Sequence, residues 1–305
     1  MKPFLLEPLH DATIWGTNNI SKARGLNEDY GTWWEVSAHS YCSNIIKGTN
    51  KTLLEAIQEN PDEILGKGYT LHETLRLAYL DTKDALSIQV HPEDAYALEH
   101  SNDYGKYESW YILEAKPGAT LVAGTTISDA NTIKEALLNN TIEQYLNKVE
   151  VKKGDYVIIP SGMLHALGKG ILALEVGTNS NTTYRFYDYN RKGKDGKTRP
   201  LHIKESFDVA NFNLKPTFVG AKAETHRIGD CPNFTVDEVY ANEDMTLTCD
   251  EHYMIVSNID QDCTILWNHE EIQLPAYDSL FVPYASKEIT LKKGAHVLVS
   301  NPRKD

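Results

Sequence analysis

Residues 154–165, Gly-Asp-Tyr-Val-Ile-Ile-Pro-Ser-Gly-Met-Leu-His, combine two turn signals with a strand signal and end on a histidine. A Gly-Asp turn comes first, and the four residues from Tyr156 are a β-branched and aromatic run of strand length. Pro160 and Gly162 end that run, because proline lacks a backbone N–H and glycine accepts positive φ. His165 then begins the next strand, just inside a barrel wall, where an imidazole is well placed to bind a metal.

A faint second copy of this pattern lies near the end of the chain. Asp278–Pro283, with the sequence Asp-Ser-Leu-Phe-Val-Pro, has the same turn–strand–turn arrangement as Asp155–Pro160. In the second copy Ala285 replaces the glycine, and Glu288 stands at the position of the histidine. Together with short strand-like runs elsewhere, the repeat predicts a mainly β protein with two barrels, of which the second is a degenerate structural copy.

Helical spacing interrupts the strands of the first half twice. A capping box opens a short helix within residues 52–66, and apolar residues recur at helical spacing over residues 129–148. The polar stretch 93–106 is expected to be a loop. We therefore predict a catalytic domain over residues 1–205, with helical insertions near 52–66 and 129–148, and a second β domain over residues 206–305.

The composition is that of an ordinary globular protein. The 305 residues are 41% hydrophobic and 24% charged, and the net charge is −13. This negative balance argues against a general nucleic-acid binder and against a membrane-surface binder. It does not exclude a small anionic substrate, since a local basic pocket can lie within an acidic surface.

Cysteine usage and the lack of long apolar segments favour a cytoplasmic protein. No run of the sequence approaches membrane-spanning length, and the N-terminus has no long apolar segment. The cysteines form no C-x-x-C pair and no tight cluster, which argues against a disulfide framework or a cysteine zinc site. They are Cys42, Cys231, Cys249 and Cys263.

Four residues together indicate a metal site. Gln89 and His91 point to one face of the strand expected at 85–91, because side chains alternate along a strand. Glu108 begins the next strand, after a loop that can return it beside His91, and His165 completes the set. Two imidazoles and a carboxylate suit catalytic zinc and leave positions for water or substrate, with Gln89 as a weaker oxygen ligand.

Five sequence blocks resemble the mannose-6-phosphate isomerase family of zinc cupins, and in particular its short bacterial form. The blocks are Ser87–Pro92, Lys106–Tyr111, Pro160–Gly170, Leu174–Asn181 and Thr183–Tyr189. The spacing G-x5-P-x-G-x2-H in the opening stretch is also the second motif of the cupin superfamily. The resemblance is dense over residues 85–205 and weak in the last hundred residues.

The resemblance implies cupin barrels, which are double-stranded β-helices or jelly rolls, and one Zn2+ per chain. It places the zinc ligands at His91, Glu108 and His165, while Gln89 matches a further ligand of longer family members. It places the catalytic arginine at Arg185. The implied reaction interconverts mannose 6-phosphate and fructose 6-phosphate through an enediolate, so the partner would be a small-molecule sugar phosphate.

Two further residues are candidates for the chemistry. Lys106 precedes Glu108 by two residues, so it faces the same side and could contact a phosphate or a hydroxyl group of the substrate. Glu175 follows His165 on the next strand and is a candidate for proton transfer, provided that the strand turns it inward. Arg185 is always protonated, and could stabilise the enediolate or bind phosphate through two parallel hydrogen bonds.

Two other functions fit parts of the pattern. Two histidines and one carboxylate also form the facial triad of non-haem iron enzymes, so a cupin dioxygenase is one alternative. A catalytically silent sugar-binding cupin is the other. It is kept open by departures such as Thr32, where the family often has a glutamate.

Overall fold

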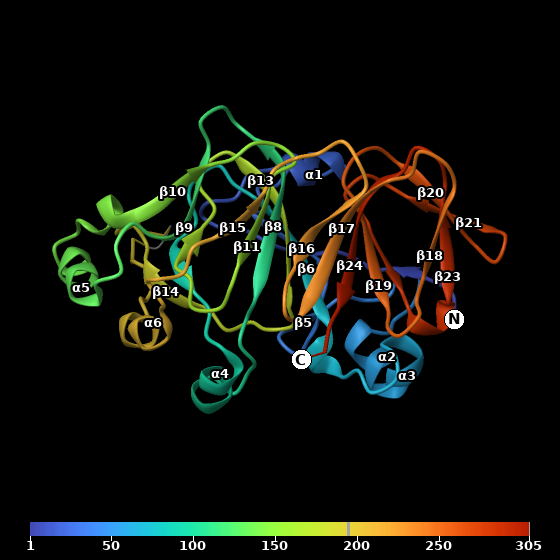
Figure 1. Cartoon of the computed structure of the whole chain (residues 1–305), viewed down its shortest axis with the longest axis horizontal. Helices are drawn as coiled ribbons and strands as arrows, with labels where there is room; N and C mark the ends of the chain where they lie inside the picture. Colours follow the sequence, from blue (N-terminus) through green and yellow to red (C-terminus); the bar gives the residue numbers. More distant parts are fainter. Residues whose placement is uncertain (194–195, 305) are drawn as a thin grey trace.

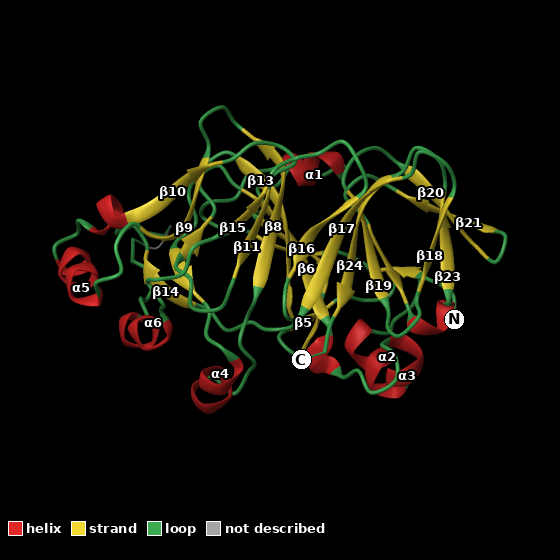
Figure 2. Cartoon of the chain, viewed as in Figure 1, coloured by secondary structure: helices red, strands yellow, loops and turns green. Residues whose placement is uncertain are grey.

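The computed structural model describes residues 1–193 and 196–304 and is mainly β, as predicted. Two barrels lie side by side in Figure 1, the first coloured mostly cyan to yellow and the second orange to red. Helices lie at the periphery of the strands, as Figure 2 shows. The fold is that of paired cupin barrels, which confirms the fold class expected from the sequence.

Two antiparallel sheets form the first barrel. Across the larger sheet the order is β15 (Thr217–Val219), β11 (Tyr156–Ile159), β8 (Glu108–Ala115), β13 (Ile171–Thr178), β6 (Leu75–Asp81), β3 (Thr32–Val36) and β2 (Leu9–Asp11). Across the smaller sheet the order is β10 (Leu146–Glu150), β9 (Thr120–Thr125), β12 (His165–Ala166), β7 (Ile88–Val90) and β14 (Tyr184–Tyr187).

Two more sheets form the second barrel. The larger has the order β1 (Phe4–Leu5), β22 (Ser279–Val282), β19 (Met254–Asn258), β24 (His296–Pro302), β17 (Phe234–Tyr240) and β16 (His226–Asp230). The smaller has the order β18 (Met245–Thr248), β23 (Glu288–Leu291), β20 (Cys263–Trp267) and β21 (Glu270–Leu274). A short hairpin pairs β4 (Ala38–His39) with β5 (Cys42–Ser43).

Each barrel takes one strand from the part of the chain that forms mainly the other barrel. β1, from the N-terminus, pairs with β22, and β15, from beyond residue 205, pairs with β11. The domain boundary near residue 205 stays a prediction.

Short helices connect the strands. They are α1 (Asn19–Ala23), α2 (Leu53–Glu59), α3 (Pro61–Ile64), α4 (Asp94–His100), α5 (Ala130–Leu138) and α6 (Ile203–Val209), with 3-10 turns at Leu71–Glu73, Ile142–Tyr145 and Tyr284–Ser286. The capping box expected at the start of the helix in 52–66 is present. Thr52 Oγ1 accepts a hydrogen bond from the Glu55 N–H, and the Glu55 carboxylate accepts one from the Thr52 N–H. The expectation of a loop over 93–106 is wrong in part. Its first half forms α4, whose apolar side is a single buried alanine, Ala97, and therefore gives no helical period in the sequence.

Alternation along β6 separates two cores. Leu75, Leu77 and Tyr79 pack between the barrels, whereas Leu80 faces the interior of the first barrel. A third cluster, which includes Val256 and Leu280, fills the second barrel. No helix of the described chain is long and apolar enough to cross a membrane, and all four cysteines are free.

Candidate metal centre and active site

One row of side chains crosses the smaller sheet of the first barrel. His165 on β12 lies directly opposite Gln89 on β7, and Gln89 lies directly opposite Arg185 on β14. Directly paired residues of antiparallel strands project from the same face, so the three side chains form one row along the barrel wall. The Gln89 amide Nε2 lies 3.3 Å from His165 Nε2. The sheet register therefore brings together residues that are up to 96 positions apart in the chain.

Glu108 faces this row from the larger sheet. Its Oε1 lies 3.1 Å from His165 Nε2, and its Oε2 lies 3.3 Å from His91 Nε2. One ligand atom from each of the three residues lies within 4.8 Å of the others, and all three residues are buried. Three side chains predicted from the sequence as a metal set are thus in one cluster, at the end of β7 and the starts of β8 and β12.

Backbone carbonyls fix the orientation of both imidazoles. His91 Nδ1 lies 2.8 Å from the Thr182 carbonyl oxygen, and His165 Nδ1 lies 2.8 Å from that of Met163. Carbonyls only accept hydrogen bonds, so each Nδ1 donates, and each neutral ring keeps a lone pair on Nε2. Both lone pairs point toward Glu108. This arrangement, with the far ring nitrogen held by a carbonyl, is typical of histidines that bind metals.

The electrostatics favour a neutral His91 beside an ionised Glu108. Burial lowers the pKa of His91 to about 4, despite the neighbouring Glu108. Burial alone would raise the pKa of Glu108, but the ammonium charge of Lys106 and the two neighbouring histidines outweigh it and hold that pKa well below its usual range. At neutral pH the cluster therefore offers a neutral His91 imidazole beside an ionised carboxylate, which are protonation states that a metal ion requires.

A buried cation lies next to the cluster. Lys106 Nζ is 2.5 Å from Glu108 Oε2 and 2.6 Å from Glu175 Oε1, and the Trp110 indole donates to Glu175 Oε2 at 3.3 Å. Burial lowers the pKa of Lys106, but the two carboxylates outweigh it and the net shift is upward. Burial and the charge of Glu108 together raise the pKa of Glu175. The register of β13 thus turns Glu175 into the barrel, beside the lysine.

Arg185 ends the row on β14. Its backbone N–H donates to His202 Nδ1 at 3.0 Å, and its Nη1 donates to the Pro200 carbonyl at 2.9 Å. Its buried Nε has no partner among the described residues. Burial and the positive charge of Arg199 lower the pKa of Arg185, although an arginine stays protonated at any physiological pH. Only Nη1 of the guanidinium has a hydrogen-bond partner among the described residues, so its Nε–H and Nη2–H groups can bind an incoming anion.

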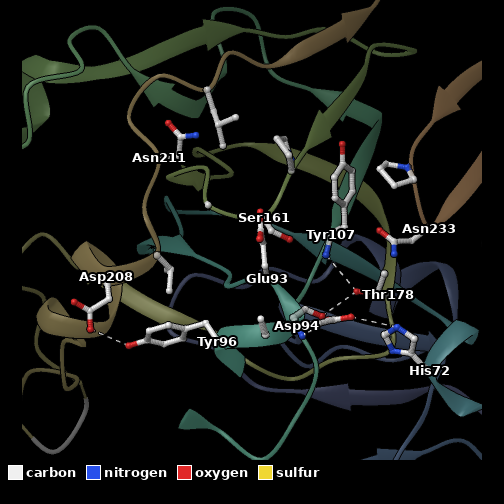
Figure 3. A pocket seen from close by; sticks show the side chains of 17 residues that line it. His72, Glu93, Asp94, Tyr96, Tyr107, Ser161, Thr178, Asp208, Asn211 and Asn233 are labelled. Carbon is white, nitrogen blue, oxygen red and sulfur yellow. Dashed lines mark hydrogen bonds and ion pairs between the residues drawn. The ribbon is translucent and has the colours of Figure 1, made fainter. Parts of the chain in front are cut away.

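A cavity of about 680 Å³ lies on the other side of the turn that carries His165. Figure 3 shows its polar lining, including Ser161, Tyr107, Asp94 and Tyr96, the last pointing to Asp208. None of the metal-set residues lines it. Ser161 connects the two sides, because its hydroxyl donates to the Lys106 carbonyl at 2.7 Å. The cavity is therefore distinct from the cluster, although Tyr107, which stands between Lys106 and Glu108, also lines it.

The similarity to known proteins extends over the whole chain. A mannose-6-phosphate isomerase of Streptococcus mutans is 32% identical over 310 residues, which covers 98% of this chain and 98% of that protein. The chain belongs to the mannose-6-phosphate isomerase family. The resemblance found in the sequence and the aldose–ketose isomerase class are thereby confirmed. No general family model matches the chain.

Solved structures of mannose-6-phosphate isomerases have the same fold. The crystal structure of the Bacillus subtilis enzyme superposes with a TM-score of 0.85 at 27% identity, covering 99% of this chain and 100% of that one. A mannose 6-phosphate isomerase bound with zinc and yttrium superposes with a TM-score of 0.74 at 14% identity, covering 100% of both chains. The second similarity is one of fold.

Some residues around the metal cluster were not singled out from the sequence. Trp110 holds Glu175, and the carbonyls of Met163 and Thr182 hold the two histidines. Backbone carbonyls carry no sequence signal. The indole could have been found from the alternation of β8, because Trp110 lies two residues after Glu108 and so faces the same side.

Proposed function

We propose that the protein is a zinc-dependent isomerase that interconverts mannose 6-phosphate and fructose 6-phosphate. The observation that carries the proposal is a buried group of acceptor atoms that face one another: His91 Nε2 and Glu108 Oε1, which have no hydrogen-bond partner among the described residues, and His165 Nε2 at 3.1 Å from that oxygen, while Lys106 holds the other oxygen of Glu108. Lone pairs of imidazole and carboxylate at 3.1–3.3 Å repel one another unless a cation lies between them. The residues therefore fit a metal ion.

The donor set favours zinc. Two imidazole nitrogens and one carboxylate oxygen are a typical catalytic zinc set, with further positions left for substrate or water. Gln89 would supply a fourth donor through its amide oxygen after a rotation of the amide, since its Nε2 now faces His165. One Zn2+ per chain would be held in this way, and a family structure that is bound with zinc supports the choice. When bound, zinc would supply the positive charge that polarises the oxygens at C1 and C2.

Glu175 and Lys106 are proposed to move the proton between C2 and C1. A raised pKa makes Glu175 a stronger base than an ordinary carboxylate, so it can remove the proton from one carbon and return it to the next. Lys106 donates to Glu175 at 2.6 Å and holds that carboxylate in place. Its ammonium group would also stabilise negative charge that develops on the substrate oxygens.

Arg185 is proposed to stabilise the enediolate. The free Nε–H and the permanent charge allow a charge-assisted hydrogen bond to an anionic oxygen. The row His165–Gln89–Arg185 places this guanidinium two strands from the metal cluster, or about 10 Å between Cα atoms. The arginine side chain can span much of that distance toward a substrate bound at the cluster.

A coupled assay for fructose 6-phosphate, with mannose 6-phosphate as substrate, tests the proposal. We expect turnover that is lost with a chelator, restored by Zn2+ and unchanged under anaerobic conditions. The dioxygenase alternative predicts dependence on oxygen, and a silent sugar-binding protein predicts no turnover. Formation of fructose 6-phosphate that is insensitive to chelator would contradict the zinc dependence.

A further inference from the structure

Arg76 on β6 is a buried cation without a counter-ion. Arg76 is 3% exposed, and among the described residues no carboxylate oxygen lies within 4.0 Å of its guanidinium nitrogens. Its hydrogen-bond partners are all neutral groups: the Ser180 carbonyl at 2.8 Å, Asn181 Oδ1 at 3.0 Å and Cys42 Sγ at 3.2 Å. A buried charge with no ionic partner is unfavourable, which indicates that an anion completes this site.

The guanidinium still has N–H groups to offer. Nη1 uses both of its hydrogens on Ser180 and Asn181, whereas Nη2 makes one contact, to Cys42. The buried Nε has no partner. Arginine carries five N–H donors, so the Nε–H and one Nη2–H remain. The Nε–H and one Nη2–H share an edge of the guanidinium, and this edge can bind two oxygens of a phosphate at once when Cys42 accepts the other Nη2–H.

Trp34 holds the guanidinium plane in position. The central carbon of the Arg76 guanidinium lies 3.8 Å from the centroid of the Trp34 ring. Stacking covers one face of the group and leaves its edges available, because an arginine donates hydrogen bonds in its own plane. The edge is therefore oriented before any ligand arrives, which reduces the entropy lost on binding.

The register of the larger sheet places Arg76 beside the metal cluster. Arg76 lies opposite Gly177 on β13, and Gly177 lies opposite Glu108 on β8. Even-numbered residues of β6 face the interior of the first barrel, as Leu80 does. Arg76 and Glu108 are thus two strands apart on one interior wall, about 10 Å between Cα atoms. Gly177 itself has no side chain, and the Lys106 side chain lies over it, 3.4 Å from the place of a Cβ.

A cavity open to solvent is lined by a hydrogen-bond partner of Arg76. Asn181, which accepts from Arg76, is exposed and lines a cavity of about 400 Å³ together with Thr182, Thr183 and His39. The Thr182 carbonyl, in the same segment, holds His91 of the metal set. Arg76 therefore lies one side chain from an open cavity and one short chain segment from the cluster.

We propose that Arg76 binds the phosphate group of the sugar phosphate while the reacting carbons lie at the metal cluster. This inference rests on the proposed function. It assigns a binding residue to the phosphate end of the substrate, for which the proposed reaction names none. The Cα separation of about 10 Å between Arg76 and Glu108 is on the scale of an extended six-carbon chain with the phosphate at one end and the carbonyl at the other. A phosphate also supplies the negative charge that the buried guanidinium lacks.

A second arginine, Arg24 at the C-terminal end of α1, offers a matched control. Arg24 stacks on Trp33, the residue next to Trp34, with its guanidinium carbon 4.7 Å from the ring centroid. Unlike Arg76, Arg24 has two carboxylate partners, Glu35 at 2.7 Å and Asp278 at 3.4 Å. Its charge is already balanced, so we expect it to have no part in binding phosphate.

Isothermal titration calorimetry with mannitol 1-phosphate, an unreactive open-chain polyol phosphate, tests the proposal on the zinc-loaded protein. We expect Arg76→Met to raise its Kd about 10- to 100-fold, the loss expected for a charge-assisted hydrogen bond. Arg76→Lys keeps the charge but loses the paired donors, so its Kd should rise several-fold. Arg24→Met should leave the Kd unchanged while lowering the unfolding temperature.

Steady-state kinetics separate this inference from the proposed function. We expect kcat/KM for mannose 6-phosphate to fall with the affinity in both Arg76 variants. No turnover by the wild type would overturn the proposed function. An unchanged Kd in Arg76→Met, or in Arg76→Lys if the first variant does not fold, would overturn the role of Arg76 alone. Failure of the wild type to bind mannitol 1-phosphate would overturn it as well.

Discussion

The two barrels share a turn–strand–turn but differ in what the following strand contributes. In the first, the five residues after β11 lead to His165, which is buried in the cluster. In the second, the five residues after β22 lead to Glu288, which is exposed. Gly162 (φ +83°) turns the first connection, whereas the second forms a 3-10 turn and ends on Lys287 (φ +69°).

The interiors of the two barrels also differ in polarity. The core of the second barrel is a continuous apolar cluster, and Leu280 there corresponds to Val157 in the first copy of the repeat. The first barrel places His91, Lys106, Glu108 and Glu175 inside its wall. Burying such groups costs stability unless they pair with each other or with a ligand. The comparison teaches that one scaffold can serve packing in one copy and chemistry in the other.

The largest effect is expected from removing His165, the residue by which the first copy of the repeat differs functionally from the second. His165→Ala should lower both bound zinc and turnover, with turnover reduced by more than about 100-fold, because even residues that only support a metal ligand contribute about 10- to 100-fold. Metal analysis and the coupled assay measure both quantities. Glu288→Ala, at the same place in the second barrel, is the control and should change neither. Equal zinc content in the wild type and His165→Ala would contradict the ligand assignment.

Arg185→Ala should separate metal binding from catalysis within the first barrel. We expect zinc content to be retained and kcat to fall about 100- to 1000-fold, as for loss of one preorganised donor to a developing anion. Metal analysis beside single-turnover kinetics would show this. Full activity in the variant would leave Arg185 without a role in the reaction.

Truncating the apolar core should affect the second barrel through stability alone. Leu280→Ala removes a fully buried side chain, and we expect it to lower the free energy of unfolding by about 2–5 kcal/mol. Zinc affinity at a temperature where the variant is folded should stay the same. Val157→Ala at the corresponding place in the first barrel lies opposite Trp110, so it should weaken turnover as well as stability. Equal loss of zinc affinity in both variants would show that the barrels are not independent in this respect.

A smaller effect is expected at the contact between the copies, where Arg24 joins Glu35 to Asp278. Burial outweighs the attraction of Arg24 and raises the pKa of Glu35 to about 7. The folded protein therefore holds a proton that the unfolded chain releases near pH 4.5, so this contribution to stability is present at low pH and is lost as the pH rises toward about 7.

Chemical unfolding of the wild type and Glu35→Gln between pH 4.5 and 8 tests this contribution. We expect the stability of the wild type to fall relative to the variant by on the order of 2–3 kcal/mol across this range. Parallel stability curves for the two proteins would show that Glu35 does not titrate there.

Much of the site was predictable because it depends on local spacing. The alternation of Gln89 with His91 puts both side chains on one face of a strand, and the turn before His165 starts a new strand. Gln89, His91 and His165 therefore follow from short patterns. The same dependence on local spacing explains why α4 was not predicted: its single buried alanine gives no helical period in the sequence. Glu175 needed more than alternation, because either face of its strand could have pointed into the barrel.

The sequence by itself determined the strand pattern, the repeated turn, the candidate metal set and, by resemblance, the family. Only the tertiary structure decided which face of each strand lies inside a barrel. Arg76 shows the difference, since a strand at 75–80 predicts two faces but does not say which one is enclosed. Its buried charge, its neutral partners and its register with Glu108 through Gly177 depend on strands that are far apart in the chain. Alternation is a local property of the backbone, whereas enclosure and charge balance are properties of the assembled barrel.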